Sequence, residues 1–171
     1  MRLLIAIALL FGLAACASVS REECLAGNWE EIGFRDGTNG QFSSYIQQHV
    51  KACQKVEVTP DPVAWERGRQ RGLPAYCVPQ KAYQVGRSGW SIREVCPAAQ
   101  MPALRAANEK GKRYHEIEDE IRQIRTQIDQ SQRLLIAEEN PAVRAALVRE
   151  QRSLNREINL LQLRQRPFAS L

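Results

Sequence analysis

The stretch that decides the fold is IEDEIRQIRTQIDQSQRLL, residues 117–135. Its apolar positions recur at alternating steps of four and three residues, with one serine in the series: Ile117, Ile121, Ile124, Ile128, Ser131 and Leu135. This rhythm is typical of the seam by which one long helix packs against another, as in a coiled coil. The sequence therefore predicts a long α-helix here.

The same rhythm resumes after an interruption at Asn140-Pro141. The resumed seam consists of Leu147, Gln151, Leu154, Ile158 and Leu161. Proline disfavours helix in the residue before it but serves well as the first residue of a new helix, with Asn140 as its cap. We predict two helices of about 23 residues that fold back as an antiparallel hairpin. A kinked continuous helix is the alternative.

Each seam is narrow, and Ser131 and Gln151 place polar groups inside it. Such a hairpin buries little apolar surface on its own. We expect residues 113–165 to dock on the rest of the chain, to self-associate or to bind another protein of the cell envelope. Internal packing alone is the simpler alternative.

The amino-terminal residues have the pattern of a secretory signal. Arg2 supplies a positive charge and residues 3–13 are almost wholly apolar, too short a run to span a membrane. Leu13-Ala14-Ala15-Cys16 resembles the bacterial lipobox, in which the cysteine is alkylated by a diacylglycerol and the chain is cut before it. The resemblance implies that residues 1–15 are removed; an ordinary signal peptide is the alternative.

A lipobox implies covalent diacylglycerol and N-acyl lipid on Cys16, and several acyl chains give stable anchoring. We predict no other cofactor. Ala17 and Ser18 follow the cysteine, and the absence of Asp there resembles lipoproteins directed to the outer membrane. The predicted location is the periplasmic face of that membrane, with residues 16–23 as lipidated tether.

Acylation of Cys16 leaves an even set of thiols for an oxidising compartment: Cys24, Cys53, Cys77 and Cys96. Two disulfides are expected, and three pairings are possible. A four-cysteine zinc site is the rival interpretation, but the spacing contains no C-x-x-C knuckle. We therefore predict no metal.

The cysteines also mark a possible internal repeat. A cysteine precedes a glycine by 9 and then 15 residues in each half, giving Cys24, Gly33, Cys53 and Gly68 and then Cys77, Gly86, Cys96 and Gly111. If the repeat is real, each copy closes on itself, and the pairs are Cys24 with Cys53 and Cys77 with Cys96. Helices over residues 21–37 and 43–54, packed antiparallel, favour the first pair independently.

Further helices are predicted over residues 61–72, with Asp61 as cap, and over residues 80–89. The fold class is therefore all-α. The expected organisation is a small disulfide-stapled helical domain over residues 24–100, followed by the long helical hairpin over residues 101–171.

Residues 24 to about 115 resemble a family of short bacterial lipoproteins catalogued as domain of unknown function 2799. The resemblance is carried by NWEEIGFRDGTNG, by HVKACQKVEVTPDPVAWERGRQRGLPAYC and by AYQVGRSGWSIREVCP. It implies an envelope lipoprotein and no particular activity. The long helical tail departs from the family's pattern.

The chain has a net charge of +5, and three arginines, Arg67, Arg69 and Arg71, lie beside Trp65. Such a cluster, with Trp29 and Trp90, is a candidate site for peptidoglycan or a small anionic ligand. A solvated surface is the simpler interpretation. Nucleic acid is not an expected partner in the periplasm.

The sequence contains no motif that carries catalytic geometry. There are two histidines, and His49 shares a predicted helix face with Cys53, as a metal pair would. Acidic residues such as Glu30, Glu31 and Asp36 are ordinary near a helix start. We predict a noncatalytic structural or protein-interaction module; a peptidoglycan or anionic-ligand binder is the alternative, and a wall hydrolase a lesser one.

Overall fold

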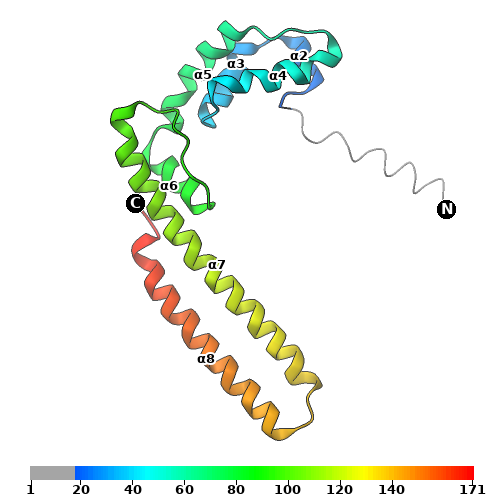
Figure 1. The fold of residues 1–171 in the computed structure, drawn as a ribbon, viewed down its shortest axis with the longest axis vertical. Coiled ribbons are helices and arrows are strands. Elements are labelled where there is room, and N and C mark those ends of the chain that lie inside the picture. The colour runs from blue at the N-terminus through cyan, green and yellow to red at the C-terminus, as the bar shows by residue number, and fades with distance from the viewer. Residues whose placement is uncertain (1–17) are drawn as a thin grey trace, which may run out of the picture. The chain divides into compact units, whose positions relative to one another are not determined.

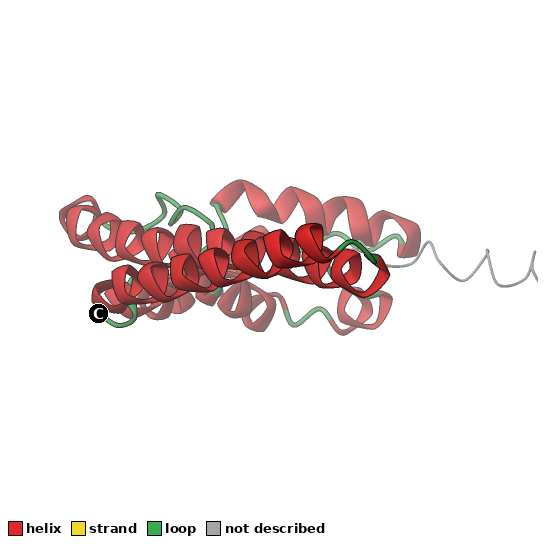
Figure 2. Cartoon of the chain, turned by 90° about the horizontal axis from the view of Figure 1, so that it is seen from below, coloured by secondary structure: helices red, strands yellow, loops and turns green. Residues whose placement is uncertain are grey.

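The structure, a computed structural model, describes residues 18–171, so the leader and the predicted acylation site at Cys16 lie outside the described residues. Seven α-helices and four short 3₁₀ helices are joined by loops, and this part of the chain contains no strand (Figure 2). The all-α prediction is confirmed. None of the described helices combines the length and apolar character that crossing a bilayer requires.

The chain divides into two compact units, Met1–Tyr76 and Cys77–Leu171. The amino-terminal unit begins with α2 (Arg21–Ala26), whose capping box joins the hydroxyl of Ser20 to the Glu23 backbone N–H. Gly27 ends this helix in the left-handed conformation, with φ of 66°. The single helix expected here is therefore two helices.

The other helices of this unit are α3 (Trp29–Thr38), α4 (Ile46–Cys53) and α5 (Pro62–Tyr76). A carboxylate oxygen of Asp61 accepts hydrogen bonds from two backbone N–H groups in the first turn of α5, at 2.9 and 3.0 Å. The predicted cap is thus present, and it satisfies donors that a helix start otherwise leaves unpaired.

Helices α3 and α5 cross at glycines, with their backbones in contact. A Cβ atom placed on Gly33 would lie 1.9 Å from the carbonyl oxygen of Trp65, and one on Gly68 would lie 1.8 Å from that of Glu30. No residue with a side chain fits either position without moving a helix. The core around this crossing consists of Val19, Cys24, Trp29, Ile32, Ile46, Cys53 and Trp65.

The carboxy-terminal unit contains a second crossing of the same kind, between α6 (Pro79–Arg87) and α7 (Met101–Ala137). A Cβ atom on Gly86 would lie 2.1 Å from the carbonyl oxygen of Asn108, and one on Gly111 would lie 2.2 Å from a carbonyl oxygen of α6. Here too the helices touch through backbone atoms.

The two crossings correspond residue by residue. In the first, the carbonyl facing Gly33 belongs to Trp65, three residues before the partner glycine of α5. In the second, the carbonyl facing Gly86 belongs to Asn108, three residues before the partner glycine of α7. The internal repeat inferred from cysteine and glycine spacing therefore has a repeated geometry.

Beyond its crossing with α6, α7 runs antiparallel to α8 (Pro141–Gln165) as a helical hairpin (Figure 1). The side-chain oxygen of Asn140 accepts from the backbone N–H groups of Ala142 and Val143. Asn140 thus caps a new helix, and the predicted hairpin rather than a kinked helix is present.

The inner sides of the hairpin follow the predicted seam. The buried seam residues are Ile117, Ile121, Ile124, Ile128, Ser131, Ile158 and Leu161. The amide nitrogen of Gln151 donates to the hydroxyl of Ser131 at 3.3 Å, so the two polar seam residues pair with each other. Towards the turn the seam residues Leu135 and Leu147 are only half-buried.

The boundary between the units differs from the predicted division at residue 100. The segment that holds Cys77 and Cys96 belongs to the same unit as the hairpin. The physical reason is the continuity of α7, a single helix of 37 residues that packs against α6 in its first half and α8 in its second. The hairpin is therefore an extension of the second crossing.

Candidate functional site

Both disulfides join neighbouring cysteines in the chain. Cys24 is bonded to Cys53 and Cys77 to Cys96, each pair with a Cα–Cα distance of 5.6 Å. These are the pairs that the repeat predicts. In each unit, the disulfide joins the segment that precedes one of the two crossing helices to the segment that precedes the other helix.

The predicted ligand cluster on α5 is not an open site. Trp65 is 1% exposed and lies in the core, and Arg69 is 6% exposed. The Arg69 guanidinium donates two hydrogen bonds of 2.7 Å to the carboxylate of Glu66 and one of 3.0 Å to the carbonyl of Gln41. Spacing i to i+4 places Trp65 and Arg69 on one helix side, and that side faces α3.

The remaining two arginines of the cluster, Arg67 and Arg71, are exposed and share one partner. Both pair with the Glu30 carboxylate, at 3.3 and 2.6 Å. The predicted cluster is therefore divided between core and surface, and its charges are compensated by nearby carboxylates. The structure therefore does not bring Trp65 and the three arginines together on one open surface.

The tryptophans do not gather on one surface. Trp29 and Trp65 lie in the core of the amino-terminal unit, whereas Trp90 is 72% exposed and belongs to the other unit. A shared aromatic platform for a glycan is therefore absent from these three residues.

A buried polar network contains His49 and Asp36, for which the sequence suggested only a possible metal pair with Cys53 and an ordinary acidic residue. Both ring nitrogens of His49 make hydrogen bonds. Nδ1 lies 2.8 Å from the Ser18 hydroxyl, and Nε2 lies 2.7 Å from Asp36 Oδ2. The indole N–H of Trp65 donates to the same Asp36 oxygen at 2.8 Å. Three helices and the amino-terminal segment thus meet through four side chains.

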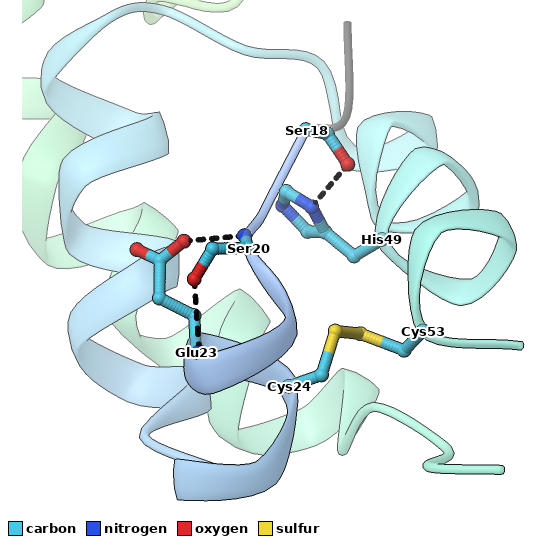
Figure 3. Close-up of a disulfide and its surroundings, with 6 residues drawn as sticks. All are labelled: Ser18, Ser20, Glu23, Cys24, His49 and Cys53. Carbon is cyan, nitrogen blue, oxygen red and sulfur yellow. Dashed lines mark hydrogen bonds between the residues drawn. A yellow bond between two sulfur atoms is a disulfide. The ribbon is translucent and has the colours of Figure 1, made fainter. Parts of the chain in front are cut away.

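The network fastens the amino-terminal segment onto α4. Figure 3 shows Ser18 beside His49 and Cys24 beside Cys53, one turn further along the same helix. Between these two attachments, Val19 is 4% exposed and belongs to the core. The chain is therefore held in place from Ser18 onward, two residues after the predicted lipid-bearing cysteine.

The order Ser18–His49–Asp36 is that of a serine-hydrolase relay, in which a histidine takes the serine proton and a carboxylate orients the ring. In this protein His49 is wholly buried and Asp36 is 6% exposed. A hydroxyl can either donate to or accept from Nδ1, so the ring is satisfied in either protonation state. The effect that this geometry supports is to fix the amino-terminal segment, because the ring joins Ser18 to Asp36.

Two carboxylates in the amino-terminal unit have perturbed acidity. The backbone N–H of Ser20, and then the Arg35 guanidinium, lower the pKa of Glu23. Hydrogen bonding from Arg69 lowers the pKa of Glu66 against the opposing effect of burial. In both cases the partner stabilises the charged form, as structural ion pairs commonly do.

The possible metal pair of His49 and Cys53 is not available. Cys53 is in a disulfide, and His49 is occupied by Ser18 and Asp36. Within residues 18–171, no group of three or more His, Cys, Asp or Glu side chains is arranged to hold a metal ion.

The sequence does carry a signal for the missed network. Asp36 follows Ile32 by four residues and so shares its inward side of α3, and His49 precedes the bonded Cys53 by four residues on the inward side of α4. A buried Asp and a buried His on neighbouring helices need partners. The spacing alone could not show that each would be the other's partner.

A family model described as "Protein of unknown function (DUF2799)" matches residues 28–113. The chain belongs to this family. The match spans both glycine crossings and ends in α7 before the hairpin, so the features that repeat lie inside it and the hairpin lies outside. No curated protein and no solved structure matches the chain.

Proposed function

We propose that this protein is a noncatalytic lipoprotein of the cell envelope, acylated at Cys16 and held at the periplasmic face of the outer membrane. The leader and the lipobox-like sequence before Cys16 support the anchor. Two disulfides support an oxidising compartment, where such bonds persist. The absence of an aspartate directly after Cys16, where Ala17 and Ser18 stand, supports a location at the outer membrane.

Its role in this proposal is that of an interaction module, and the observation that carries it is the turn end of the hairpin. Residues 134–148 have the sequence LLIAEENPAVRAALV, in which ten of 15 residues are apolar. None of the fifteen is buried, and Leu134 and Ile136 are 61% and 85% exposed. Exposed apolar residues gathered in this way commonly mark a protein contact.

The test is a shortened hairpin examined in cells. Deleting residues 132–150 and joining the ends with a short glycine-rich turn keeps the Ser131–Gln151 pair and the buried seam below it. Crosslinking in intact cells, followed by mass spectrometry, should show that the protein partners or oligomers of the wild type are lost. A milder variant, with Leu134, Ile136 and Val143 changed to Gln, should give the same loss.

The matched control places the same number of Gln substitutions elsewhere, at the exposed Val63 and Leu25 and at the half-buried Val50. That variant should keep the wild-type crosslinks. If the shortened hairpin retains every crosslinked partner, the interaction role is wrong.

The anchor is tested separately. Cys16→Ala should abolish acylation and move the protein out of the membrane fraction. Cys24→Ala should leave acylation and fractionation intact and should instead destabilise the amino-terminal unit. Membrane association that survives Cys16→Ala, with no acyl mass on the wild type, would exclude the lipoprotein assignment.

A further inference from the structure

The side of α8 that faces away from α7 carries arginines and leucines at regular spacing. Each seam residue from Leu147 to Leu161 has a counterpart two positions later, which lies about 200° further round a helix with 3.6 residues per turn. These counterparts, with one flanking arginine, define the outer face of α8: Arg149, Arg152, Ser153, Arg156, Leu160 and Leu163.

All six residues of the outer face of α8 are exposed. Leu160 and Leu163 are 67% and 52% exposed, although each lies within two positions of a buried residue, Ile158 or Leu161. The two leucines therefore do not serve the packing of the hairpin. They remain as large apolar groups at one end of the face, with the arginines at the other.

The charge of this face is uncompensated. The ion pairs seen in residues 18–171 involve none of Arg149, Arg152 and Arg156. The acidic residues of α8, Glu150 and Glu157, lie one position after Arg149 and Arg156 and so point to the flank. By contrast, the exposed arginines of α5 share a glutamate.

A hollow at the turn end continues the positive charge. Arg149 and Arg152 line it together with Arg144, and the other lining residues are Leu135, Ala145 and Val148. The Arg144 guanidinium also donates to the carbonyl oxygens at the end of α7, which fixes it in place. Arginine side chains beside apolar ones suit a phosphate group attached to an apolar body.

We propose that the outer face of α8 is a second membrane contact, which lies on a layer of anionic phospholipid headgroups. The arginines bind lipid phosphates, and Leu160 and Leu163 enter the boundary of the acyl chains, as in helices that lie in the plane of a bilayer surface. The helix, 25 residues and about 37 Å long, presents this face over its last four turns. The inference deepens the proposed function, because it assumes that the protein works at a membrane.

Phospholipid fits this face better than a protein partner does. A surface with three arginines and no acidic residue matches an extended layer of negative charge, and the exposed leucines match the apolar boundary beneath it. The exposed apolar residues of the turn that do not line this hollow, among them Leu134, Ile136 and Val143, remain the proposed protein contact, since they flank the acidic pair Glu138 and Glu139.

The experiment uses a photoactivatable benzophenone side chain in the full acylated protein, in cells. It is introduced at Ser153, within the outer face of α8, and as a matched control at Thr126, on the exposed side of α7. We expect phospholipid adducts at Ser153 and few at Thr126. Arg149→Gln, Arg152→Gln and Arg156→Gln together should remove the adducts at Ser153.

A second experiment measures how much the three arginines contribute to membrane binding. Residues 17–171, which contain every residue of the described fold, are mixed with vesicles of phosphatidylethanolamine and phosphatidylglycerol or of phosphatidylcholine alone. The triple Arg→Gln variant should bind the anionic vesicles about a hundredfold more weakly, since each basic residue near such a surface contributes about a factor of five. Arg122→Gln, Arg125→Gln and Arg133→Gln in α7 are the control with the same charge change and should change binding much less.

Three outcomes would contradict the proposed membrane contact. Protein adducts without lipid at Ser153, equal lipid labelling at both positions, or equal weakening by both triple variants would overturn the second contact. If the protein is acylated and membrane-bound yet shows one of these results, only this inference fails. If it is neither acylated nor in the membrane fraction, the proposed function fails as well.

Discussion

The glycine crossing of the amino-terminal unit predicts a large effect from one methyl group, in the variant Gly68→Ala. The new Cβ atom would lie 1.8 Å from the carbonyl oxygen of Glu30 and 2.8 Å from the backbone nitrogen of Phe34. Real Cβ atoms essentially never come within 3.0 Å of such neighbours. Because both neighbours are backbone atoms of α3, no side-chain rotation relieves the clash, and the helices must separate by at least about 1.2 Å.

Separation of this size loosens the contacts between α3 and α5, including the hydrogen bond from Trp65 to Asp36. Inserting extra atoms into a packed core costs about 1–3 kcal/mol when side chains can adjust, and more when backbone must move. Alanine is better than glycine within a helix by about 1 kcal/mol, which offsets part of the loss. We expect Gly68→Ala to lower the free energy of unfolding by about 2–3 kcal/mol.

The assay is urea unfolding of the oxidised protein followed by tryptophan fluorescence. Two of the three tryptophans, Trp29 and Trp65, are buried in the unit that is perturbed, so the signal reports its unfolding. Gln70→Ala is the control, since it changes an exposed residue of the same helix and should alter the free energy by no more than about 0.5 kcal/mol. A Gly68→Ala protein as stable as the wild type would refute the close backbone contact.

Three other changes test separate features. His49→Ala removes the centre of the buried network and leaves polar groups on two sides without this hydrogen-bond partner. Thermal unfolding should therefore show that the free energy of unfolding falls by about 2–4 kcal/mol. Changing both Cys77 and Cys96 to Ser opens a 19-residue loop, and chemical denaturation should show a loss of roughly 3 kcal/mol. Arg69 lowers the pKa of Glu66, so the charged pair contributes fully to the free energy of unfolding above the ordinary pKa of 4.5. That contribution is lost as the pH falls through the lower pKa of the folded state. When the free energy of unfolding is measured against pH, Glu66→Gln should therefore show a smaller loss of stability on the acid side.

Much of the fold can be predicted from local patterns of residues in the sequence. The capping box at Ser20, the cap at Asp61 and the start of α8 at Asn140-Pro141 are each set by a few neighbouring residues. The repeated spacing of cysteine and glycine was enough to indicate both disulfide pairs. These features were predictable because each depends on residues that are close in sequence or on a simple count.

What could not be predicted depends on which side of a helix faces inward. The α5 sequence, with Trp65 and Arg69 four residues apart, suits either an exposed basic patch or a buried pair, and only packing against α3 decides between them. The same holds for Asp36 and His49, whose partnership requires that α3 and α4 be brought together. The division into units likewise depends on α7 being continuous past Gly111.

The pairing of the disulfides has a consequence for how the protein acquires its structure. Each bond joins one cysteine to the next cysteine in the chain, and the two loops do not overlap. If the chain enters an oxidising compartment with its amino terminus leading, Cys53 is the next thiol to arrive after Cys24, and their bond can form before Cys77 and Cys96 arrive. Oxidation in order of arrival then gives the native pairs, so maturation should need an oxidant but no later exchange of disulfides.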